Sequence, residues 1–220
     1  KILAGLDELQ NTLYAHSKHG VLIVIQGMDA SGKDGIIRNV YGHLNPQGVM
    51  VQYYKAPTAE ELAHDFLWRI HKHSPAKAVL QIFNRSHYED VVVTRVHKII
   101  DDETAYKRMK AINDFEELLT KHNNTLILKF YLHVSYKEQH ERLQERIHDV
   151  TKQWKYNEQD FIESALRKEY LHAYEDCFKH SNIPWIIVPA DQNWYKEYLI
   201  ASSLCEALKK LNMQYPGLKK

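Results

Sequence analysis

Cysteine is scarce in this chain: its 220 residues include only Cys177 and Cys205. Two distant cysteines exclude a disulfide framework and leave no cysteine-based zinc motif, so we expect free thiols in a reducing compartment. The 14 histidines do not form a zinc-binding motif either. Pairs such as His71 and His73 lack Cys or carboxylate companions at ligand spacing, so no dedicated zinc site is expected.

Long apolar runs and a signal-peptide pattern are also absent. A membrane span needs about 18 or more consecutive apolar residues, so we expect none and place the protein in the cytoplasm. Neither sign of charge dominates, because the chain has 29 basic and 28 acidic residues and a net charge of +1. This balance argues against a general nucleic-acid binder. Since the chain opens at Lys1 rather than Met, inside a helical pattern, we expect it to continue a longer N-terminal sequence.

Glycine and proline are few, with 8 and 6 residues, and they form no linker. The length and the absence of repeats favour one domain over residues 1–220. Strands are predicted at residues 21–25, 49–54, 78–83, 125–134 and 185–188, helices at residues 3–13, 35–44, 58–73, 103–122, 161–179 and 194–211, and capping boxes at Thr58/Glu61 and Ser135/Glu138. The alternation predicts an α/β fold, a three-layer α/β/α architecture with a parallel central sheet.

The segment after the first predicted strand carries the main motif. Gly27, Gly32 and Lys33 satisfy the pattern G-x-x-x-x-G-K between a strand and a helix, which is the setting of a phosphate-binding P-loop. Backbone N–H groups of the loop, which includes Ala30 and Ser31, and of the next helix N-terminus supply positive partial charge for phosphate. Lys33 adds a full charge. The alternative is a glycine turn with a chance lysine.

Two carboxylates lie in this anion-binding loop. Asp34 occupies the position that usually holds Ser or Thr, and Asp29 lies inside the loop. A carboxylate is repelled by phosphate unless a cation lies between them, so both are candidate ligands of Mg²⁺, with Mn²⁺ as the other cation considered. Asp29 could instead orient an incoming phosphate nucleophile. The structural alternatives are a helix-dipole role for Asp34 and a plain turn role for Asp29.

Asn84 and Arg85 follow the third predicted strand. Ligands of open α/β sheets bind at the carboxyl ends of the strands, where many P-loop enzymes place an acid that supports Mg²⁺. Here that position is Asn84, and Arg85 is suited to bind phosphate in fork geometry. The structural alternative is that Arg85 pairs with Glu89 or Asp90 of the following helix.

Arg142 and Arg146 are four residues apart and therefore share one helix face. Acidic neighbours such as Glu138 and Glu145 could pair with them as a solvated helix surface, the interpretation that spacing alone favours. Their position after the fourth predicted strand favours a second interpretation. P-loop kinases carry a mobile lid there, predicted here over approximately residues 142–160, whose arginines close over the phosphates.

These motifs resemble the polyphosphate kinase 2 family, and the resemblance covers nearly the whole chain in order. The matching blocks are GMDASGKDG at residues 27–35, LNPQGV at 44–49, KAPTAEEL at 55–62, HDFLWR at 64–69, FNRSHYEDV at 83–91, VTRVH at 93–97, AYED at 173–176 and PWIIVPAD at 184–191. The resemblance implies a P-loop kinase that moves a terminal phosphoryl group between inorganic polyphosphate and a nucleotide with Mg²⁺. The blocks NPQGV, HDFLWR and NRSHYEDV are most similar to the subgroup that accepts both AMP and ADP.

The resemblance also implies roles for individual residues. Asp29 would bind Mg²⁺ and orient the acceptor phosphate, and Lys33 would hold the transferring phosphate. Arg85 would belong to the arginine-containing pair at the strand end. Arg146, together with Arg142, would be a lid arginine that neutralises charge in the transition state.

One position departs from the family pattern. Many relatives have Asp where this chain has Asn84, and because an amide adds no charge to a metal site, the metal role shifts toward Asp29. The family further implies a basic polyphosphate channel, for which Lys55, Arg69 and Lys72 are the candidates, and a homo-oligomer, either a dimer or a tetramer.

The predicted function is reversible in-line transfer of a terminal phosphoryl group from polyphosphate to AMP or ADP. Adenine nucleotides are the expected acceptors, and the sequence leaves open whether guanine nucleotides are accepted too. An ATP-dependent nucleoside or nucleotide kinase on the same scaffold is the nearest alternative. The other is a non-enzymatic polyanion or nucleic-acid binder, against which the balanced charge and the lack of an aromatic-basic RNA motif argue. Acceptor preference, polyphosphate length and physiological direction stay open at this point.

Overall fold

A parallel sheet forms the centre of the molecule in the computed structural model, which describes residues 1–218. The strands are β1 (Gly20–Gln26), β2 (Val49–Tyr53), β3 (Leu80–Asn84), β4 (Thr125–His133) and β5 (Trp185–Pro189). They lie in the order β2-β3-β1-β4-β5, and every neighbouring pair is parallel. The predicted α/β fold with a parallel central sheet is therefore confirmed.

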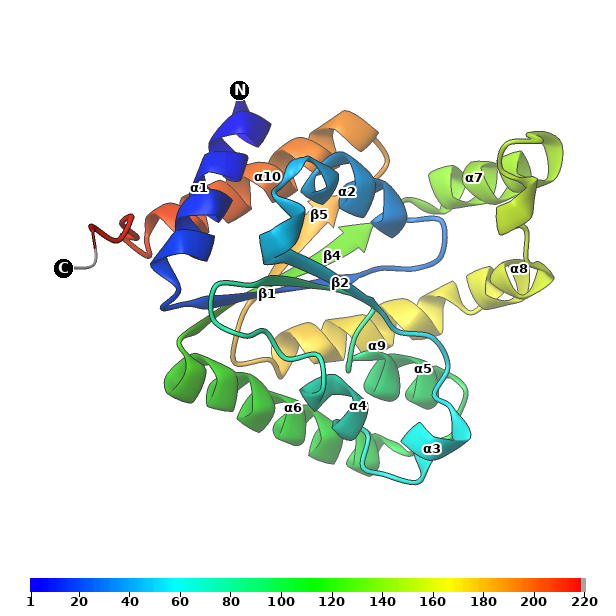
Figure 1. Ribbon diagram of the computed structural model, residues 1–220. Helices are drawn as coiled ribbons and strands as arrows, with labels where there is room; N and C mark the ends of the chain where they lie inside the picture. Colours follow the sequence, from blue (N-terminus) through cyan, green and yellow to red (C-terminus); the bar gives the residue numbers. More distant parts are fainter. Residues whose placement is uncertain (219–220) are drawn as a thin grey trace.

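Helices cover both faces of the sheet (Figure 1). One face carries α1 (Ile2–His16), α2 (Lys33–Asn39) and α10 (Asn193–Lys209), and the other carries α4 (Trp68–His71), α5 (Glu89–Val96), α6 (Asp102–Asn123) and α9 (Arg167–Lys179). The remaining elements are α3 (Ala59–Leu62), α7 (Tyr136–His148), α8 (Glu158–Ala165) and the 3-10 turns η1 (Tyr41–His43), η2 (Pro46–Gly48) and η3 (Gln153–Lys155). Helices α7 and α8 project beyond the end of the sheet, and we call residues 136–165 the arm.

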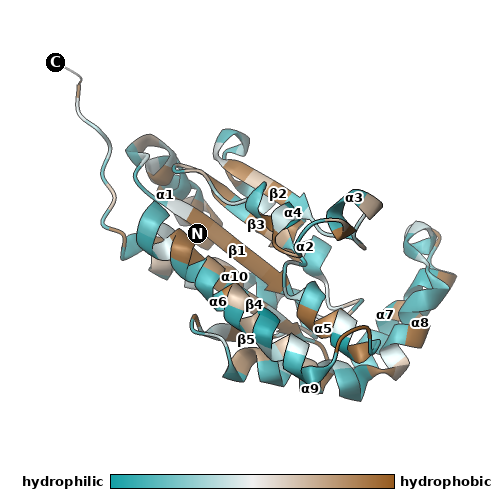
Figure 2. Ribbon diagram, turned by 90° about the horizontal axis from the view of Figure 1, so that it is seen from below, coloured by the Kyte–Doolittle hydropathy of each residue, from teal (hydrophilic) through white to brown (hydrophobic). Residues whose placement is uncertain are grey.

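Strand β1 explains why the core has two halves. It lies in the middle of the sheet and every one of its residues is buried. Successive side chains of a strand point to opposite faces, so Ile23 packs under α1 and α10 while Val24 packs toward α5, α6 and α9. A strand covered on both faces is apolar over nearly its whole length, and β1 appears as a mostly hydrophobic strand at the molecule's centre (Figure 2).

The prediction of one continuous helix at residues 58–73 is wrong. Its capping box does form, because Thr58 Oγ1 accepts from the Glu61 N–H at 3.2 Å and Glu61 Oε2 accepts from the Thr58 N–H at 2.8 Å. Helix α3 nevertheless ends at Leu62. Asp65 Oδ1 accepts from the Leu67 N–H at 3.0 Å, a local side-chain bond that competes with the helical ladder. The chain becomes helical again only at α4.

Two further helices are shorter than predicted. The helix predicted at residues 35–44 ends at Asn39 and gives way to η1, which directs the buried side chains of Tyr41 and Leu44 into the core under α1 and α10. The helix predicted at residues 161–179 breaks at Leu166, whose N–H bonds to the Glu163 carbonyl at 3.1 Å in a tightened turn. This break lets α8 leave α9 and join the arm.

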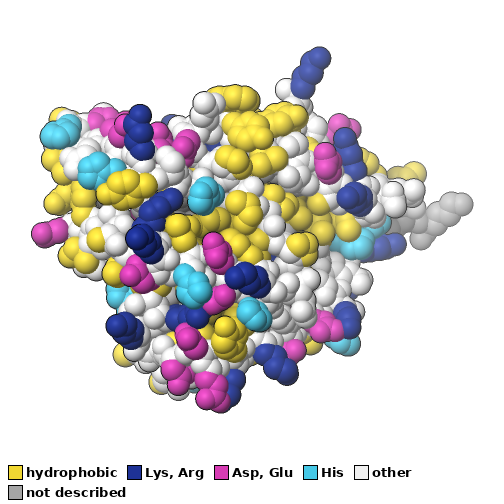
Figure 3. Space-filling view, turned by 180° about the vertical axis from the view of Figure 1, so that it is seen from behind, with side chains coloured by type: hydrophobic (Ala, Val, Ile, Leu, Met, Phe, Trp, Pro, Cys, Tyr) yellow, Lys and Arg dark blue, Asp and Glu magenta, His cyan; other side chains and the backbone are white. Residues whose placement is uncertain are grey.

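Charge on the surface is mixed. On the face opposite to that of Figure 1, acidic and basic side chains lie interspersed with apolar ones (Figure 3), as a net charge of +1 leads one to expect. No helix formed by residues 1–218 combines the length and the apolar character that crossing a membrane requires.

Candidate active site

The loop between β1 and α2 has the backbone that its glycines were expected to allow. Gly27 has φ +152° and Gly32 has φ +96°, both in the region that glycine adopts at low cost. A Cβ on Gly27 would lie 2.8 Å from Ser31 Oγ and 2.9 Å from the Leu132 carbonyl oxygen. The loop therefore closes tightly on itself and on β4, and a side chain at position 27 would push it open.

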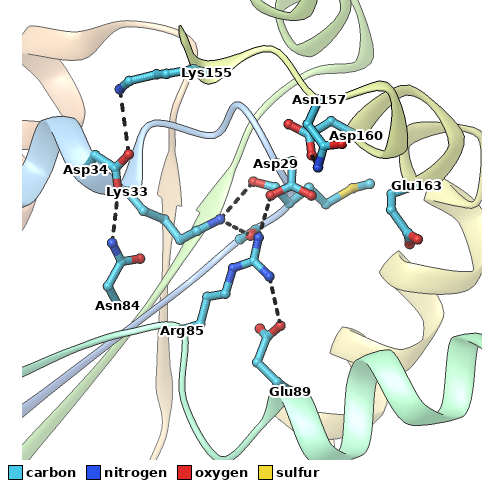
Figure 4. Close-up of polar contacts among 12 residues, drawn as sticks. Asp29, Lys33, Asp34, Asn84, Arg85, Glu89, Lys155, Asn157, Asp160 and Glu163 are labelled. Atoms are coloured by element: carbon cyan, nitrogen blue, oxygen red, sulfur yellow. Dashed lines mark hydrogen bonds and ion pairs between the residues drawn. The ribbon is translucent and has the colours of Figure 1, made fainter. Parts of the chain in front are cut away.

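Lys33 lies across this loop. Its Nζ donates to the carbonyl oxygens of Gly27 at 2.6 Å and of Met28 at 3.1 Å (Figure 4). The side chain is buried, and burial lowers the pKa of Lys33, although the carboxylate of Asp29 opposes that shift. The two hydrogen bonds hold the Lys33 ammonium group beside the loop in which a phosphate would lie.

Asp29 and Arg85 meet at the mouth of the loop. Arg85 Nη2 lies 2.8 Å from Asp29 Oδ1, and its Nη1 lies 3.6 Å from Glu89 Oε2. The predicted structural pairing with Glu89 and the contact with the P-loop acid therefore coexist. Burial lowers the pKa of Arg85, but the carboxylates of Glu89 and Asp29 outweigh it and raise that pKa overall. Arg85 itself adopts φ +62°, an uncommon backbone for a non-glycine residue.

Asp34 and Asn84 form a second polar contact. Asn84 Nδ2 donates to Asp34 Oδ1 at 2.9 Å, and Lys155 Nζ reaches Asp34 Oδ2 at 3.6 Å from the tip of the arm. The other amide atom, Asn84 Oδ1, is buried and has no hydrogen-bond partner among residues 1–218. A buried acceptor without a donor is costly, so this oxygen is suited to a cation or to a donor brought by a ligand.

The oxygen atoms around the P-loop could supply part of the ligand set of a divalent cation. Asp29, Asp34 and Asn84 Oδ1 are hard oxygen donors, the type that Mg²⁺ prefers. Within residues 1–218 no three or more His, Cys, Asp or Glu side chains lie in an arrangement that could hold a metal ion alone. The donor set therefore suits a cation that keeps several ligands from water and phosphate, which is the usual habit of Mg²⁺ in phosphotransfer sites.

The arginines of the arm make different contacts. Arg142 Nη1 donates to the carbonyls of Ala30 at 3.0 Å and Ser31 at 3.3 Å, while its Nε donates to Glu138 at 2.8 Å. Arg146 Nη1 pairs with Asp160 of α8. Arg142 thus bonds to the P-loop itself, whereas Arg146 joins the two helices of the arm.

The three channel candidates lie apart from these contacts. Arg69 is buried, donates to the Lys55 carbonyl at 2.9 Å, and pairs with Asp90 at 3.1 Å. Lys72 Nζ lies 3.1 Å from the centre of the Trp68 ring. The Lys55 side chain is exposed. Because the charge of Arg69 is neutralised by Asp90, it is the least available of the three to a polyanion, and the channel stays a prediction.

Sequence reasoning missed several residues at this site. Asp160 and Glu163 of the arm face Asp29 across the mouth (Figure 4), and the cleft beside the P-loop is lined by Asp29, Arg85, Glu89, Glu163 and other residues. Burial and the Asp29 carboxylate raise the pKa of Asp160, although Arg146 opposes this. Neither acid belongs to a motif, so no sequence signal marked them.

Comparison with known proteins places the chain in a family. Residues 1–216 match the model of the polyphosphate kinase 2 (PPK2) family. The chain belongs to this family. It is 46% identical over 214 residues to the AMP/ADP-polyphosphate phosphotransferase of Meiothermus ruber, which covers 96% of this chain and 80% of that protein. It is 39% identical over 226 residues to the ADP-polyphosphate phosphotransferase of Rhodopseudomonas palustris, covering 96% of this chain and 78% of that protein.

A solved structure gives the same result. The crystal structure of polyphosphate kinase 2 from Arthrobacter aurescens TC1 superposes with a TM-score of 0.96 at 40% identity, covering 100% of this chain and 80% of that one. The family resemblance inferred from the motifs is thus confirmed. The P-loop, the strand-end pair at Asn84 and Arg85, and the arm all lie within the matched residues.

Proposed function

We propose that this protein transfers the terminal phosphoryl group of inorganic polyphosphate to AMP or ADP. The observation that carries the proposal is the contact between Asp29 and Arg85 beside the Lys33 ammonium. It assembles an acid and two cations where two phosphate groups would meet. The relatives named as AMP/ADP- and ADP-polyphosphate phosphotransferases support this choice of donor and acceptor.

The transfer is a balanced exchange of one P–O bond for another. An oxygen of the nucleotide's terminal phosphate attacks the terminal phosphorus of the polyphosphate, and the bridging P–O bond breaks. The polyphosphate leaves shortened by one phosphate. Because charge spreads over the moving phosphoryl group, positioning and electrostatic stabilisation supply most of the catalysis.

The residues of the chain divide this work. Backbone N–H groups of the P-loop and the N-terminus of α2 bind phosphate oxygens. Lys33 and Arg85 neutralise the charge of the phosphates, and Asp29 holds the Arg85 guanidinium in place at 2.8 Å. Carboxylates that line the mouth, among them Glu89 and Glu163, repel phosphate and so favour an approach that a cation accompanies.

Kinase chemistry of this class requires a divalent cation, and we propose Mg²⁺, with Mn²⁺ as a substitute. Asp29, Asp34 and the buried Asn84 Oδ1 would hold it. When bound, such an ion neutralises phosphate charge and aligns the reacting groups. Because Lys155 lies 3.6 Å from Asp34, a cation there would compete with this lysine for the carboxylate.

The arm is the proposed lid of this single kinase domain. It touches the P-loop through Arg142 and reaches Asp34 through Lys155, so its closure would shield the phosphates from water. We further propose that Arg146 exchanges Asp160 for a substrate phosphate when the lid closes.

One assay separates this function from ATP-dependent nucleoside or nucleotide kinase activity. The protein is incubated with ADP, long-chain polyphosphate and Mg²⁺, without any other phosphate donor, and ATP is measured. We expect ATP to form, and the same assay with AMP, followed by chromatography for ADP and ATP, gives the acceptor preference. Phosphorylation of nucleotides by ATP with no transfer from polyphosphate would refute the proposal.

A further inference from the structure

Lys196 of α10 is a buried lysine that no motif marked. Its side chain is 1% exposed, and its Nζ donates to Asn193 Oδ1 at 2.7 Å and to the Ser31 carbonyl at 3.4 Å. Within residues 1–218, Lys196 forms no ion pair with a carboxylate. A buried ammonium group bound only to neutral oxygens is costly, so its place behind the P-loop calls for a reason other than stability.

The ammonium group occupies space that Gly32 leaves free. A Cβ on Gly32 would lie 2.2 Å from Lys196 Nζ and 3.6 Å from Arg142 Nη1. The side chains of Arg142 from α7 and Lys196 from α10 therefore both lie on the side of Gly32 where a Cβ would be. The glycine at this position permits both its φ of +96° and the close approach of Lys196.

Both cations hold the same carbonyl. Ser31 O accepts from Lys196 at 3.4 Å and from Arg142 at 3.3 Å. The peptide between Ser31 and Gly32 is trans, and in a trans peptide the C=O and the following N–H point in opposite directions. Holding the Ser31 carbonyl outward therefore turns the Gly32 N–H away from the two cations, toward the inside of the loop where phosphate binds.

We propose that Lys196 is a positioning residue of the phosphotransfer site, which with Arg142 orients the Ser31–Gly32 peptide for phosphate. The proposal rests on the function proposed above. Because the Lys196 ammonium lies 3.4 Å from the Ser31 carbonyl of the loop, its charge also adds to the positive potential at the loop. Lys196 thereby links α10, the last helix of the fold, to the first phosphate-binding element.

The charge of this lysine is sensitive to pH. Burial and then the neighbouring Arg142 lower the pKa of Lys196 to about 8, against the opposing effects of Glu197 and Glu138. The charged groups that face it are thus Arg142 and Glu138 of α7 and Glu197 of its own helix. As the pH rises through about 8 the ammonium loses its proton, and the rate supported by its charge falls.

The test compares Lys196→Met, Lys196→Arg and, as a control, Lys209→Met, which removes an exposed lysine of the same helix. Initial rates of ATP formation from ADP and polyphosphate give kcat and KM from neutral to alkaline pH. Calorimetric titration with tripolyphosphate reports phosphate binding without turnover. Urea unfolding of each variant shows whether it is folded.

We expect Lys196→Met to remain folded, to bind tripolyphosphate more weakly, and to lose about 100-fold in kcat/KM, the scale expected for misplacing a site by about 1 Å. Lys196→Arg keeps a charge that does not titrate in this range, so it should retain most activity and hold its rate to higher pH than the parent. Lys209→Met should match the parent.

Two results would overturn the proposal. The first is Lys196→Met with the kcat/KM and tripolyphosphate affinity of the parent. The second is Lys196→Arg with the same alkaline decline as the parent. If the parent itself makes no ATP from polyphosphate, the proposed function fails, and the tripolyphosphate affinities of the variants still decide the role of Lys196.

Discussion

Asp29 is the residue whose charge matters most to the proposed reaction, and Asp29→Asn removes that charge while keeping the shape of the side chain. The amide oxygen of Asn can still accept the hydrogen bond that Arg85 Nη2 now gives to Asp29 Oδ1 at 2.8 Å. Any loss of activity in this variant therefore reports the missing negative charge rather than a displaced Arg85.

The expected cost to stability is small. The Asp29 side chain is 25% exposed and that of Arg85 is 31% exposed, and ion pairs open to solvent contribute about 0–1 kcal/mol to folding. Arg85 also keeps Glu89 as a partner at 3.6 Å. The cost to catalysis is larger, because removing one charged group that acts in the transition state lowers the rate by about 100-fold, or about 2.7 kcal/mol.

The assay is the rate of ATP formation from ADP and polyphosphate over a series of Mg²⁺ concentrations, with urea unfolding measured alongside. We expect the turnover of Asp29→Asn to fall by about 100-fold or more while its unfolding midpoint stays near that of the parent. The matched control is Asp114→Asn, which neutralises an exposed acid paired with Lys110 at 3.4 Å on α6. Turnover by Asp29→Asn equal to that of this control would refute the assigned role.

Other changes test the loop and the core. Lys33→Met should abolish transfer, because the ammonium beside the Gly27 and Met28 carbonyls is lost; full ATP formation by a folded variant would contradict this. Gly27→Ala should destabilise the protein by about 1–3 kcal/mol in urea unfolding, because its Cβ would lie 2.9 Å from the Leu132 carbonyl oxygen. Gly35→Ala on α2 should be neutral or slightly stabilising, because its Cβ would meet no atom of residues 1–218 within 4 Å. Lys129→Met should cost about 3–5 kcal/mol, since it strips the buried Glu116 of a partner at 2.7 Å; a midpoint like that of Lys110→Met, which breaks an exposed pair, would show that the buried pair contributes little.

Local signals in the sequence were sufficient for the elements that form the centre of the site. The apolar run of β1, the glycines at 27 and 32, and Lys33 predict a strand, a phosphate loop and a helix in succession, because each depends on neighbouring residues only. The resemblance to polyphosphate kinase 2 rested on the same local blocks and is confirmed by the family match. The parallel sheet followed from the alternation of strands and helices.

Two interruptions of predicted helices were not foreseen from the sequence. The helix expected at residues 58–73 is interrupted by the Asp65 side chain, and the helix expected at residues 161–179 breaks at Leu166 to build the arm. Helical periodicity continues through both breaks, so the pattern alone gave no warning. At each break the structure shows a short-range hydrogen bond, from the Leu67 N–H to Asp65 Oδ1 and from the Leu166 N–H to the Glu163 carbonyl.

The sequence by itself determined the fold class, the family and the residues of the P-loop. Each of these depends on short patterns of neighbouring residues, such as the apolar runs of the strands and the glycines of the loop. Only the tertiary structure decided which charges meet. Asp29 pairs with Arg85 from β3's end, Arg146 with Asp160 in the arm, and Lys196 reaches the Ser31 carbonyl from a helix near the chain's other end. Such contacts depend on how the elements pack in three dimensions, since these charged side chains and their partners are far apart along the chain.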